Sequence, residues 1–522
     1  MPDAVILPNS HVDKKRSKIL LWLEEGIWGH RLYDDQTPWL AMLEFLNVFC
    51  SRMADGKALR EEVGPDRHED IVYGMERMRA VRYLVFNNPY MRQVEQSVQS
   101  DSERWKRWLD HVGDNALKID FGYLRKRFND FSELCRVVEF FQETAVQVQT
   151  NKRWTSRFVF PYGPDCLYAD LDGVGEMLGS NDRRFFARGG ELLYLMLNRS
   201  SRAEEVADAI RGKLLDGTNR WNRLVKVLLP DGHGQQREQV SSVKAGYLPC
   251  LCLPDYDRLA EDWLAVLSLG LPGQGLVDPL VRLTGLSVVL YLLGRARSAT
   301  GETESRLVLE IAAPRRSPIL DLSRDNFDSN RNAPLRAIER RMLDVRGTQA
   351  WKSAVADKHD PREAALKVLA DEFCWSPSQE EKSKITNPAM ALSVMEGAAK
   401  KRHGQHFAKV LPAWSRAIGL ATARRSVGTW YSPSDPLIKA LVMANVPRQE
   451  EFNIFLARLY DRYGIVIGVA EAERSFGSLP VDAQAFRDNA ERLEHRMRAL
   501  GLVRRLSDDC AYVINPFAGE PQ

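Results

Sequence analysis

Apolar side chains recur every three or four residues along most of the chain, the spacing that places them on one face of an α-helix. Extended candidates are few: aromatic or β-branched runs bounded by Pro and Gly lie near residues 157–163, 246–254 and 306–314. The pattern therefore predicts a mainly α protein with a few short strands. The clearest helical segments read SKILLWLEEGIW, SERWKRWLDHV, SELCRVVEFFQETAVQV, AEEVADAIRGKLL and TNRWNRLVKVLL.

At 522 residues the chain is too long for one ordinary core, so we expect a multi-domain helical scaffold. Polar breaks lie at 229–239 and 298–305, and the segment 373–388 is predicted to be a linker. A helix is expected to start at Asn332 or Ala333, before Pro334. The expected domains are an N-terminal helical domain (1–150), a central helical domain with short strands (151–300), a mixed α/β segment and linker (301–395), and a basic segment plus a winged-helix-like domain (396–522).

One polar stretch near the N-terminus, WGHRLYDDQTPWLAMLEFL, has the residue types of a catalytic site. Thr37 followed by Pro38 predicts a helix start, with Thr as N-cap and Pro at the first helical position. Glu44 is the only charge in the apolar helix that follows, and a buried carboxylate needs a partner, which we expect to be His30 or Arg31. This structural interpretation is favoured over catalysis.

A second polar stretch, SNDRRFFARGGELLYLMLNRS, places Arg183, Arg184 and Arg188 before a glycine pair. Glu191 then begins an apolar helix, where the helix dipole stabilises a carboxylate. These arginines could bind phosphate or pair with carboxylates of the same chain. We favour pairing.

The last ninety residues show the clearest architectural pattern. Helices are predicted over DPLIKALVMAN, QEEFNIFLARLYDRYG and VDAQAFRDNAERLEHRMRALG, and a strand, a tight turn and a second strand follow. This order resembles winged helix-turn-helix domains, in which the third helix often enters the major groove. The alternative is a winged helix that serves only protein interaction. Candidate DNA contacts on the third helix and the following strand are Arg487, Arg492, Arg496, Arg498, Arg504 and Arg505.

A basic run precedes this pattern: residues 397–434 contain no Asp or Glu. Because the net charge of the whole chain is only +3, a local patch of this kind matters more than the total. Phosphate neutralisation is one use for it, and Trp414, Trp430 and Tyr431 could stack on unpaired bases. The alternative is a solvated face that pairs with acidic surfaces. The candidate nucleic-acid-binding cations are Lys400, Lys401, Arg402, Lys409, Arg416, Arg424 and Arg425.

Cysteine usage and hydropathy bear on location. Seven cysteines without a CxxC motif favour a reducing compartment, and the N-terminal residues lack a secretory signal pattern, so we expect a cytoplasmic protein. The apolar stretch GLVDPLVRLTGLSVVLYLLGR contains Asp278, Pro279 and Arg282. A buried core helix is therefore favoured over a membrane span, and no membrane partner is expected.

Motifs for known chemistry are mostly missing. The sequence has no P-loop, no GxGxxG after a strand and no HExxH, so no cofactor is expected. Cys250 and Cys252 form a CxC without a second ligand pair, and His403 and His406 lack a nearby acid, so no metal is expected either. Glu310 on a predicted strand is the one candidate carboxylate for a metal-dependent nuclease. The catalytic residues of any enzymatic activity are unknown from sequence.

The phrases IWGHRLYDDQTPW, FFARGGELLYLML and RLYDRYGIVIG look similar to uncharacterised proteins from bacterial anti-phage defence islands. This resemblance implies a subunit that works beside other proteins of a multigene system. Our leading hypothesis is a non-enzymatic DNA-associated subunit or adaptor. The alternatives are a metal-dependent nuclease with an unrecognised site and a protein-interaction scaffold without nucleic-acid contact.

Overall fold

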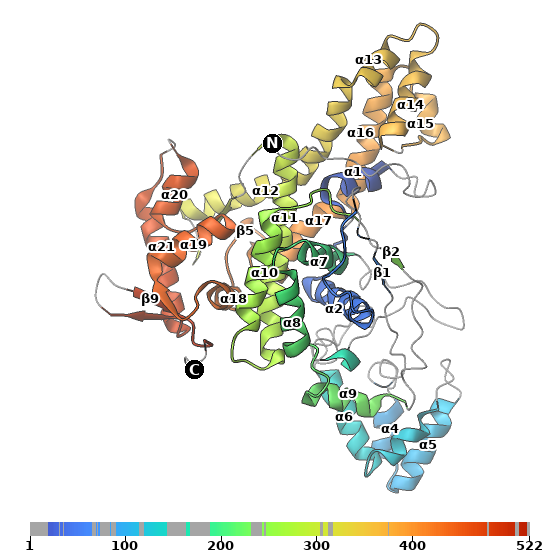
Figure 1. Cartoon of the computed structure of the whole chain (residues 1–522), viewed down its shortest axis with the longest axis vertical. Helices are drawn as coiled ribbons and strands as arrows, with labels where there is room; N and C mark the ends of the chain where they lie inside the picture. The colour runs from blue at the N-terminus through green and yellow to red at the C-terminus, as the bar shows by residue number, and fades with distance from the viewer. Residues whose placement is uncertain are drawn as a thin grey trace.

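The computed structural model describes residues 19–30, 32–34, 36–64, 69, 71–73, 84, 90–113, 120–143, 163–166, 188–230, 243–244, 247–302, 306–311, 317–373, 375–477, 480–506 and 511–518. Most of these residues are helical and the strands are short, which confirms the mainly α prediction. Figure 1 shows a helical centre from which an arm, a lobe and a C-terminal unit extend in different directions.

The centre is built around α11 (Gly273–Thr300). Helices α10 (Pro254–Leu267), α2 (Pro38–Ala54), α12 (Pro318–Asp344) and α18 (Asp435–Asn445) pack against it. By length and composition α11 could cross a membrane, but 83% of its most apolar window is buried inside the fold. The structure thus places this stretch in a core, as predicted.

Helices α2 and α7 (Gly189–Asn198) pack with very little space between their backbones. Thr37 caps α2 and Pro38 is its first residue, as predicted. Gly190 permits the close approach, because a Cβ atom there would lie 2.3 Å from the backbone nitrogen of Phe45. Two further helices complete the centre: α1 (Ile19–Trp28), which packs against α11, and α8 (Ala203–Lys213), which packs against α10.

Short helices form the lobe at the bottom of Figure 1. They are α4 (Tyr90–Ser97), α5 (Asp101–Gly113), α6 (Phe131–Glu143) and α9 (Arg220–Leu228). Trp105 and Phe131 meet edge to face, with ring centroids 5.2 Å apart, and Trp108 packs beside them. Phe140 and Trp221 stack at 5.5 Å and join α6 to α9. The lobe core is therefore largely aromatic.

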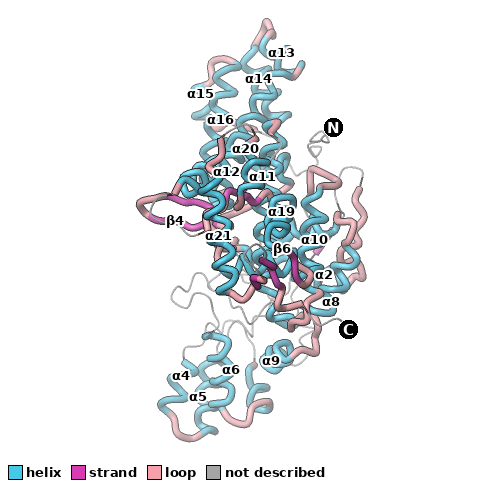
Figure 2. The backbone as a smooth tube through the Cα atoms, turned by 90° about the vertical axis from the view of Figure 1, so that its left-hand side faces the viewer, coloured by secondary structure: helices cyan, strands magenta, loops and turns pink. Residues whose placement is uncertain are grey.

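The arm consists of the far end of α12 together with α13 (Gln349–Val355), α14 (Pro361–Phe373), α15 (Gln379–Lys384) and α16 (Pro388–Gln405), as Figure 2 shows. The segment expected to be a linker contains α15 and joins α14 to α16, which pack together. The helix start expected before Pro334 is wrong. Ser317 caps α12 and Pro318 is its first residue, so Pro334 lies inside a continuous helix. Helix α17 (Phe407–Ala417) leads from the arm back to the centre.

The C-terminal unit, defined here as residues 435–514, contains α18, α19 (Phe452–Tyr463), α20 (Val469–Phe476) and α21 (Ala483–Ala499). Its antiparallel sheet has the order β6-β9-β8, where β6 is Gln449–Glu451, β8 is Val503–Arg505 and β9 is Ala511–Ile514. The helix expected over 449–464 starts at Phe452 because β6 occupies its first residues, and Gly464 ends it in the left-handed conformation. Helix α20 was not predicted.

Backbone pairing ties the C-terminal unit to the centre. Strand β7 (Ile465–Val466) pairs in parallel with β3 (Leu307–Val308), the only part of the strand expected over 306–314 that forms within the described residues. Asn489 on α21 is fully buried, donates to the carbonyls of Leu309 and Ile467, and accepts from the backbone N–H of Ile311. The C-terminal unit is thus part of one continuous core.

The remaining strands form two small pairs. Strands β4 (Ala421–Arg424) and β5 (Gly428–Tyr431) make a hairpin that projects from the molecule in Figure 2. Strand β1 (Val72–Tyr73) pairs with β2 (Val243–Lys244). The strand expected over 246–254 is wrong, because residues 248–253 are irregular and lead into α10. Of the strand expected over 157–163, only Gly163 belongs to the described residues.

Candidate nucleic-acid interface

Helix α21 turns an apolar stripe inward and a charged face outward. Phe486, Leu493 and Met497 are buried, as their spacing predicted. Asp482 caps the helix by accepting from the backbone N–H of Ala485 at 3.0 Å. The outward face runs the length of the helix. Its exposed residues include Gln484, Arg487, Glu491, His495 and Arg498.

Strand β8 extends this face with two exposed arginines, Arg504 and Arg505. Glu494 lies 2.9 Å from Arg498 and 3.8 Å from Arg505, so one carboxylate faces two guanidinium groups. Within the described residues Arg504 forms no ion pair. We call Arg498, Arg504 and Arg505 the wing patch; within the described residues, Glu494 is the one carboxylate that pairs with it.

The other arginines of α21 differ from one another. Among the described residues Arg487 donates to the amide oxygen of Gln484, at 2.8 Å, so its charge is not neutralised by that contact. Arg492 is half-buried and forms no ion pair with a described residue. Arg496 contacts Asp435 at 2.7 Å and donates to the carbonyl of Ile311 at 3.3 Å. Arg496 thus anchors α21 to the fold in this structure.

Two of the seven cations in the basic run before the C-terminal unit pair with acids. Lys400 lies 2.7 Å from both Glu339 and Glu396, and Lys409 lies 3.9 Å from Asp34. Among the described residues, the exposed cations that form no ion pair are Lys401, Arg416, Arg424 and Arg425. The remaining contacts are Arg402 to Gln405, Arg416 to the Pro412 carbonyl, and Arg424 over the ring of Trp430.

The expected base-stacking aromatics are wrong. Trp414, Trp430 and Tyr431 have 1% exposure or less. The Trp414 indole N–H donates to the carbonyl of Gln36 at 2.7 Å, and the Tyr431 hydroxyl accepts from Asn330 at 3.1 Å. These rings hold the β4–β5 hairpin and α17 against the centre and present no face to an unpaired base.

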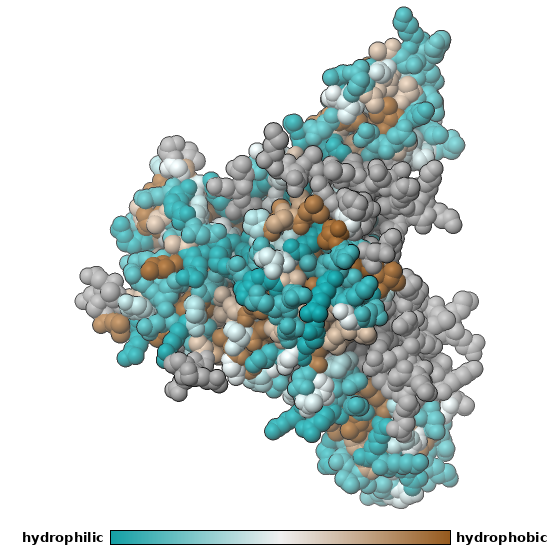
Figure 3. Space-filling view, in the orientation of Figure 1, coloured by the Kyte–Doolittle hydropathy of each residue, from teal (hydrophilic) through white to brown (hydrophobic). Residues whose placement is uncertain are grey.

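The thirteen predicted cations therefore do not form one surface. Figures 1 and 2 both place α16 in the arm and α21 in the C-terminal unit, well separated from each other. The residues of α21 and β8 combine exposure, proximity and an excess of arginine, and the face of the C-terminal unit seen in Figure 3 is mainly hydrophilic. This part of the molecule is the stronger candidate interface.

The two polar stretches noted near the N-terminus and before α7 meet in one buried network. The Glu191 carboxylate contacts His30 at 2.7 Å, the Tyr73 hydroxyl at 2.6 Å and Arg188 at 2.8 Å. The expected pairing of Arg188 with a carboxylate is therefore confirmed, whereas Arg183 and Arg184 lie outside the described residues. Arg188 holds a left-handed backbone, with φ at 66°.

Glu44 lies in the same network but has different partners from those expected. It is buried, as predicted, and it accepts from the Gln36 amide and the Gly190 backbone N–H, both at 2.8 Å, and from the Arg188 backbone N–H at 3.2 Å. The expectation of His30 is wrong, because that ring bonds to Glu191. Arg31, the other expected partner, is not among the described residues.

The pKa values of the two buried carboxylates are shifted in opposite directions. For Glu44 burial dominates over its hydrogen bonds and raises its pKa to about 8. For Glu191 burial is outweighed by the charge of Arg188 and by the hydrogen bond from His30, which hold its pKa well below the usual range. At neutral pH Glu44 is mostly protonated and Glu191 is ionised.

The other chemical candidates are poorly placed for catalysis. Glu310 is fully buried, which leaves its carboxylate no exposed surface for a metal ion from solvent. His403 is buried against Phe407, and burial lowers its pKa to about 4. Within the described residues no group of three or more His, Cys, Asp or Glu side chains is placed to hold a metal ion.

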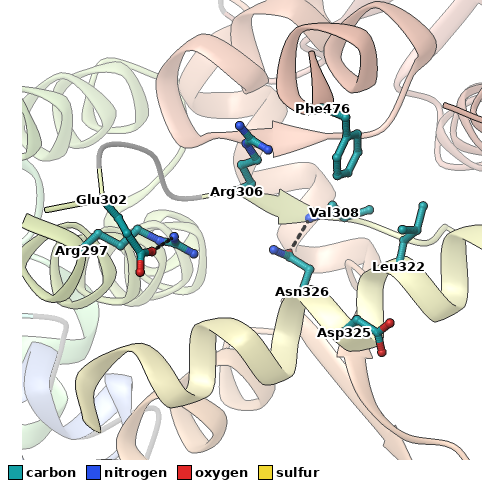
Figure 4. Close-up of a pocket in the computed structure, with 8 residues that line it drawn as sticks. All are labelled: Arg297, Glu302, Arg306, Val308, Leu322, Asp325, Asn326 and Phe476. Carbon is teal, nitrogen blue, oxygen red and sulfur yellow. Dashed lines mark hydrogen bonds and ion pairs between the residues drawn. The ribbon is translucent and has the colours of Figure 1, made fainter. Parts of the chain in front are cut away.

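Sequence reasoning missed a pocket shown in Figure 4, which lies between α12, β3 and the end of α20. Its charged and aromatic lining includes Arg297, Arg306 and Phe476. These residues come from segments separated by up to 180 positions, and no local motif marks them.

Part of the C-terminal unit matches a known protein family. Residues 444–516 match the family model described as methylation-associated defense system protein MAD7. This match points to a defence system. It supports a component that works with other proteins of that system, as the resemblance implied. The comparisons with curated proteins and with solved structures found no match.

Proposed function

We propose that this protein is a non-enzymatic, DNA-associated adaptor of a cytoplasmic defence complex, and that its C-terminal unit contacts duplex DNA. The observation that carries the proposal is the wing patch. Its three arginines are exposed, two of them lie beside the single carboxylate of Glu494, and they stand at the end of a helix whose outer face is open to solvent.

The order of elements supports the same proposal. Helices α18, α19 and α21 followed by β8 and β9 are in the order that the winged helix-turn-helix resemblance implies, and β6, which pairs with β9, is an addition to that order. Helix α20 and strand β7 are additions between the second and third helices. In this proposal α21 is the recognition helix and the β8–β9 pair is the wing.

Electrostatics favour phosphate as the first contact. Arginine binds phosphate oxygens with charge-assisted, often bidentate hydrogen bonds, and each phosphate contact releases condensed counterions. Such contacts position a protein on DNA without reading its sequence. Because Asp488, Glu491 and Glu494 dilute the positive face of α21, we expect backbone contacts from the wing patch to supply most of the affinity.

The proposal is tested by electrophoretic mobility shift with the full chain and a duplex of about thirty base pairs. The full chain is used because β3 and Asn489 tie the C-terminal unit to the centre. Arg504→Glu combined with Arg505→Glu should weaken binding by tenfold or more, since two phosphate contacts become repulsive.

A matched control reverses two cations of the arm, Lys352→Glu with Lys358→Glu. Both residues are exposed and neither forms an ion pair with a described residue. This control should bind duplex DNA as the unmodified chain does. Equal affinity of both double variants would overturn the DNA proposal. Partner capture that survives nuclease treatment and is lost in Arg504→Glu/Arg505→Glu would then assign the wing patch to protein interaction.

A further inference from the structure

The pocket between α12, β3 and α20 has a volume of about 540 Å³ and opens to solvent. Ligand pockets for small molecules span roughly 300–1,000 Å³. As Figure 4 shows, Arg306 and Phe476 lie side by side on one wall, Leu322 and Asp325 come from α12, and Arg297 lies with Glu302 at one end. The size and the mixed lining suit a small molecule with both a charged and an apolar part.

Among the described residues at that end of the pocket, three arginines lie near one carboxylate. Glu302 contacts Arg297 at 2.5 Å and Arg336 at 3.9 Å, so one carboxylate serves two guanidinium groups. Arg306 adds a third positive charge nearby, and burial together with the charges of Arg336 and Arg306 lowers the pKa of Arg297. An arginine-rich end of this kind suits an anionic group of a ligand.

Arg297 also retains an unused donor. Its terminal nitrogens donate to Glu302 and to the amide oxygen of Asn330, at 2.5 and 2.7 Å. Its Nε–H is buried and has no hydrogen-bond partner among the described residues. A buried donor without a partner costs free energy, so a ligand oxygen that reached it would be favoured. An anion that displaced Glu302 would meet Arg297, Arg306 and Arg336 together.

Phe476 and Leu322 give the pocket an apolar part. Phe476 is half-buried, and the Arg306 guanidinium lies 5.8 Å from its ring centroid. Leu322 exposes 39% of its surface, which is high for a leucine that lines a hollow. A planar aromatic ring could stack on Phe476 or Arg306 and cover Leu322. Asp325 and Asn326 then offer polar groups for the ring edge.

We propose that this pocket binds a nucleotide, with the phosphate at the arginine end and the base against Phe476 and Leu322. An inorganic anion would contact the arginines but leave the apolar wall exposed. A nucleoside would cover the apolar wall but leave the arginines without an anion. The nucleotide is either a free mononucleotide or the terminal, unpaired nucleotide of a strand. This inference goes beyond DNA binding by the wing patch and does not rest on it.

Isothermal titration calorimetry with the full chain tests the proposal. The probes are the four common 5′-nucleoside monophosphates, the matching nucleosides and inorganic phosphate. At least one monophosphate should bind with a Kd below ~1 mM, and its nucleoside and phosphate should each bind at least tenfold more weakly. A 5′-phosphorylated ten-nucleotide single strand distinguishes the sources: tighter binding of the strand assigns the site to strand ends, and equal or weaker binding assigns it to free nucleotides.

Two variants act on opposite ends of the pocket. Arg306→Gln removes charge, and Leu322→Trp fills the hollow from an exposed position where the fold tolerates a larger side chain. Each should weaken nucleotide binding by tenfold or more. Arg340→Gln, at an exposed position further along α12, is the control and should leave the affinity unchanged. Thermal melting checks that all three variants fold.

The proposal is overturned if no monophosphate binds at a probe concentration of about 5 mM, which detects Kd values on the order of millimolar. Binding that is unchanged in both Arg306→Gln and Leu322→Trp also overturns it. The electrophoretic mobility shift with duplex DNA is also measured for Arg306→Gln and Leu322→Trp. Because Arg306→Gln leaves the wing patch intact, loss of nucleotide binding with retained duplex binding separates the two proposals.

Discussion

The buried network between α2 and α7 and the wing patch on the C-terminal unit both concentrate charge, but they treat it differently. In the network, Glu191 is matched by Arg188, His30 and Tyr73, and Glu44 is held mostly neutral. In the wing patch, one carboxylate faces two guanidinium groups and Arg504 forms no ion pair with a described residue. Burial forces charges to be paired or neutralised, whereas exposure allows charge to remain available for a partner.

Removing the central carboxylate of the network should have the largest effect. Glu191→Ala leaves the buried His30 and the partly buried Arg188 without their acceptor, so the free energy of unfolding should fall by about 3–5 kcal/mol. Chemical denaturation followed by circular dichroism measures it. Glu205→Ala on α8, where the carboxylate is exposed, is the matched control and should leave stability unchanged. A loss of less than about 1 kcal/mol for Glu191→Ala would mean that the network is not structural.

The close packing of α2 and α7 should be the next most sensitive feature. Gly190→Ala places a Cβ within 2.6 Å of the Phe45 nitrogen, the Ala41 carbonyl and Glu44, and it should cost about 1–3 kcal/mol of stability. Gly294→Ala in α11, where nothing lies within 4 Å, should instead stabilise by up to about 1 kcal/mol. Denaturant midpoints compare the two. Equal effects would show that α2 and α7 are not in close contact.

The opposite protonation of the two carboxylates should appear in the pH dependence of stability. The folded state keeps the Glu44 proton up to about pH 8, whereas the unfolded state releases it near pH 4.5. Between these values the unfolded state binds fewer protons, so stability falls as pH rises, by up to about 1.4 kcal/mol per pH unit. Glu191 acts in reverse, because its contribution is present above pH 4.5 and is lost as pH falls below it.

Glu44→Gln should remove the slope between pH 4.5 and 8, because the amide keeps the neutral shape of the protonated acid. Melting temperatures measured at half-unit intervals of pH provide the readout. If Glu44→Gln and the unmodified chain show the same slope over this range, then Glu44 is ionised in the folded state and the assignment is wrong.

Local rules predicted the features that depend on neighbouring residues. Thr37 and Pro38 start α2, Gly464 ends α19, and the apolar stripe of α21 is buried as its spacing indicated. Each depends on capping geometry or helical periodicity, which a short window of sequence contains. The domain boundaries and the cytoplasmic location stay predictions.

Features that depend on tertiary contact were not predictable in this way. Glu44 accepts from the Gly190 backbone because α7 lies across α2, and nothing near Glu44 in the sequence encodes that crossing. Trp430 and Tyr431 looked available for stacking, but the β4–β5 hairpin packs them onto α12. Pro334 looked like a helix start because a proline inside a helix is costly in isolation; in α12 tertiary packing outweighs that cost.

The contrast between the buried network and the wing patch depends most on whether the wing patch binds phosphate. The decisive measurement is the salt dependence of duplex-DNA affinity for the full chain, with and without Arg504→Gln and Arg505→Gln. The account predicts that log K falls linearly with log salt concentration, and that the double variant makes the slope shallower by about 1.8, or roughly 0.9 for each lost phosphate contact. Identical slopes, or no duplex binding at low salt, would contradict it.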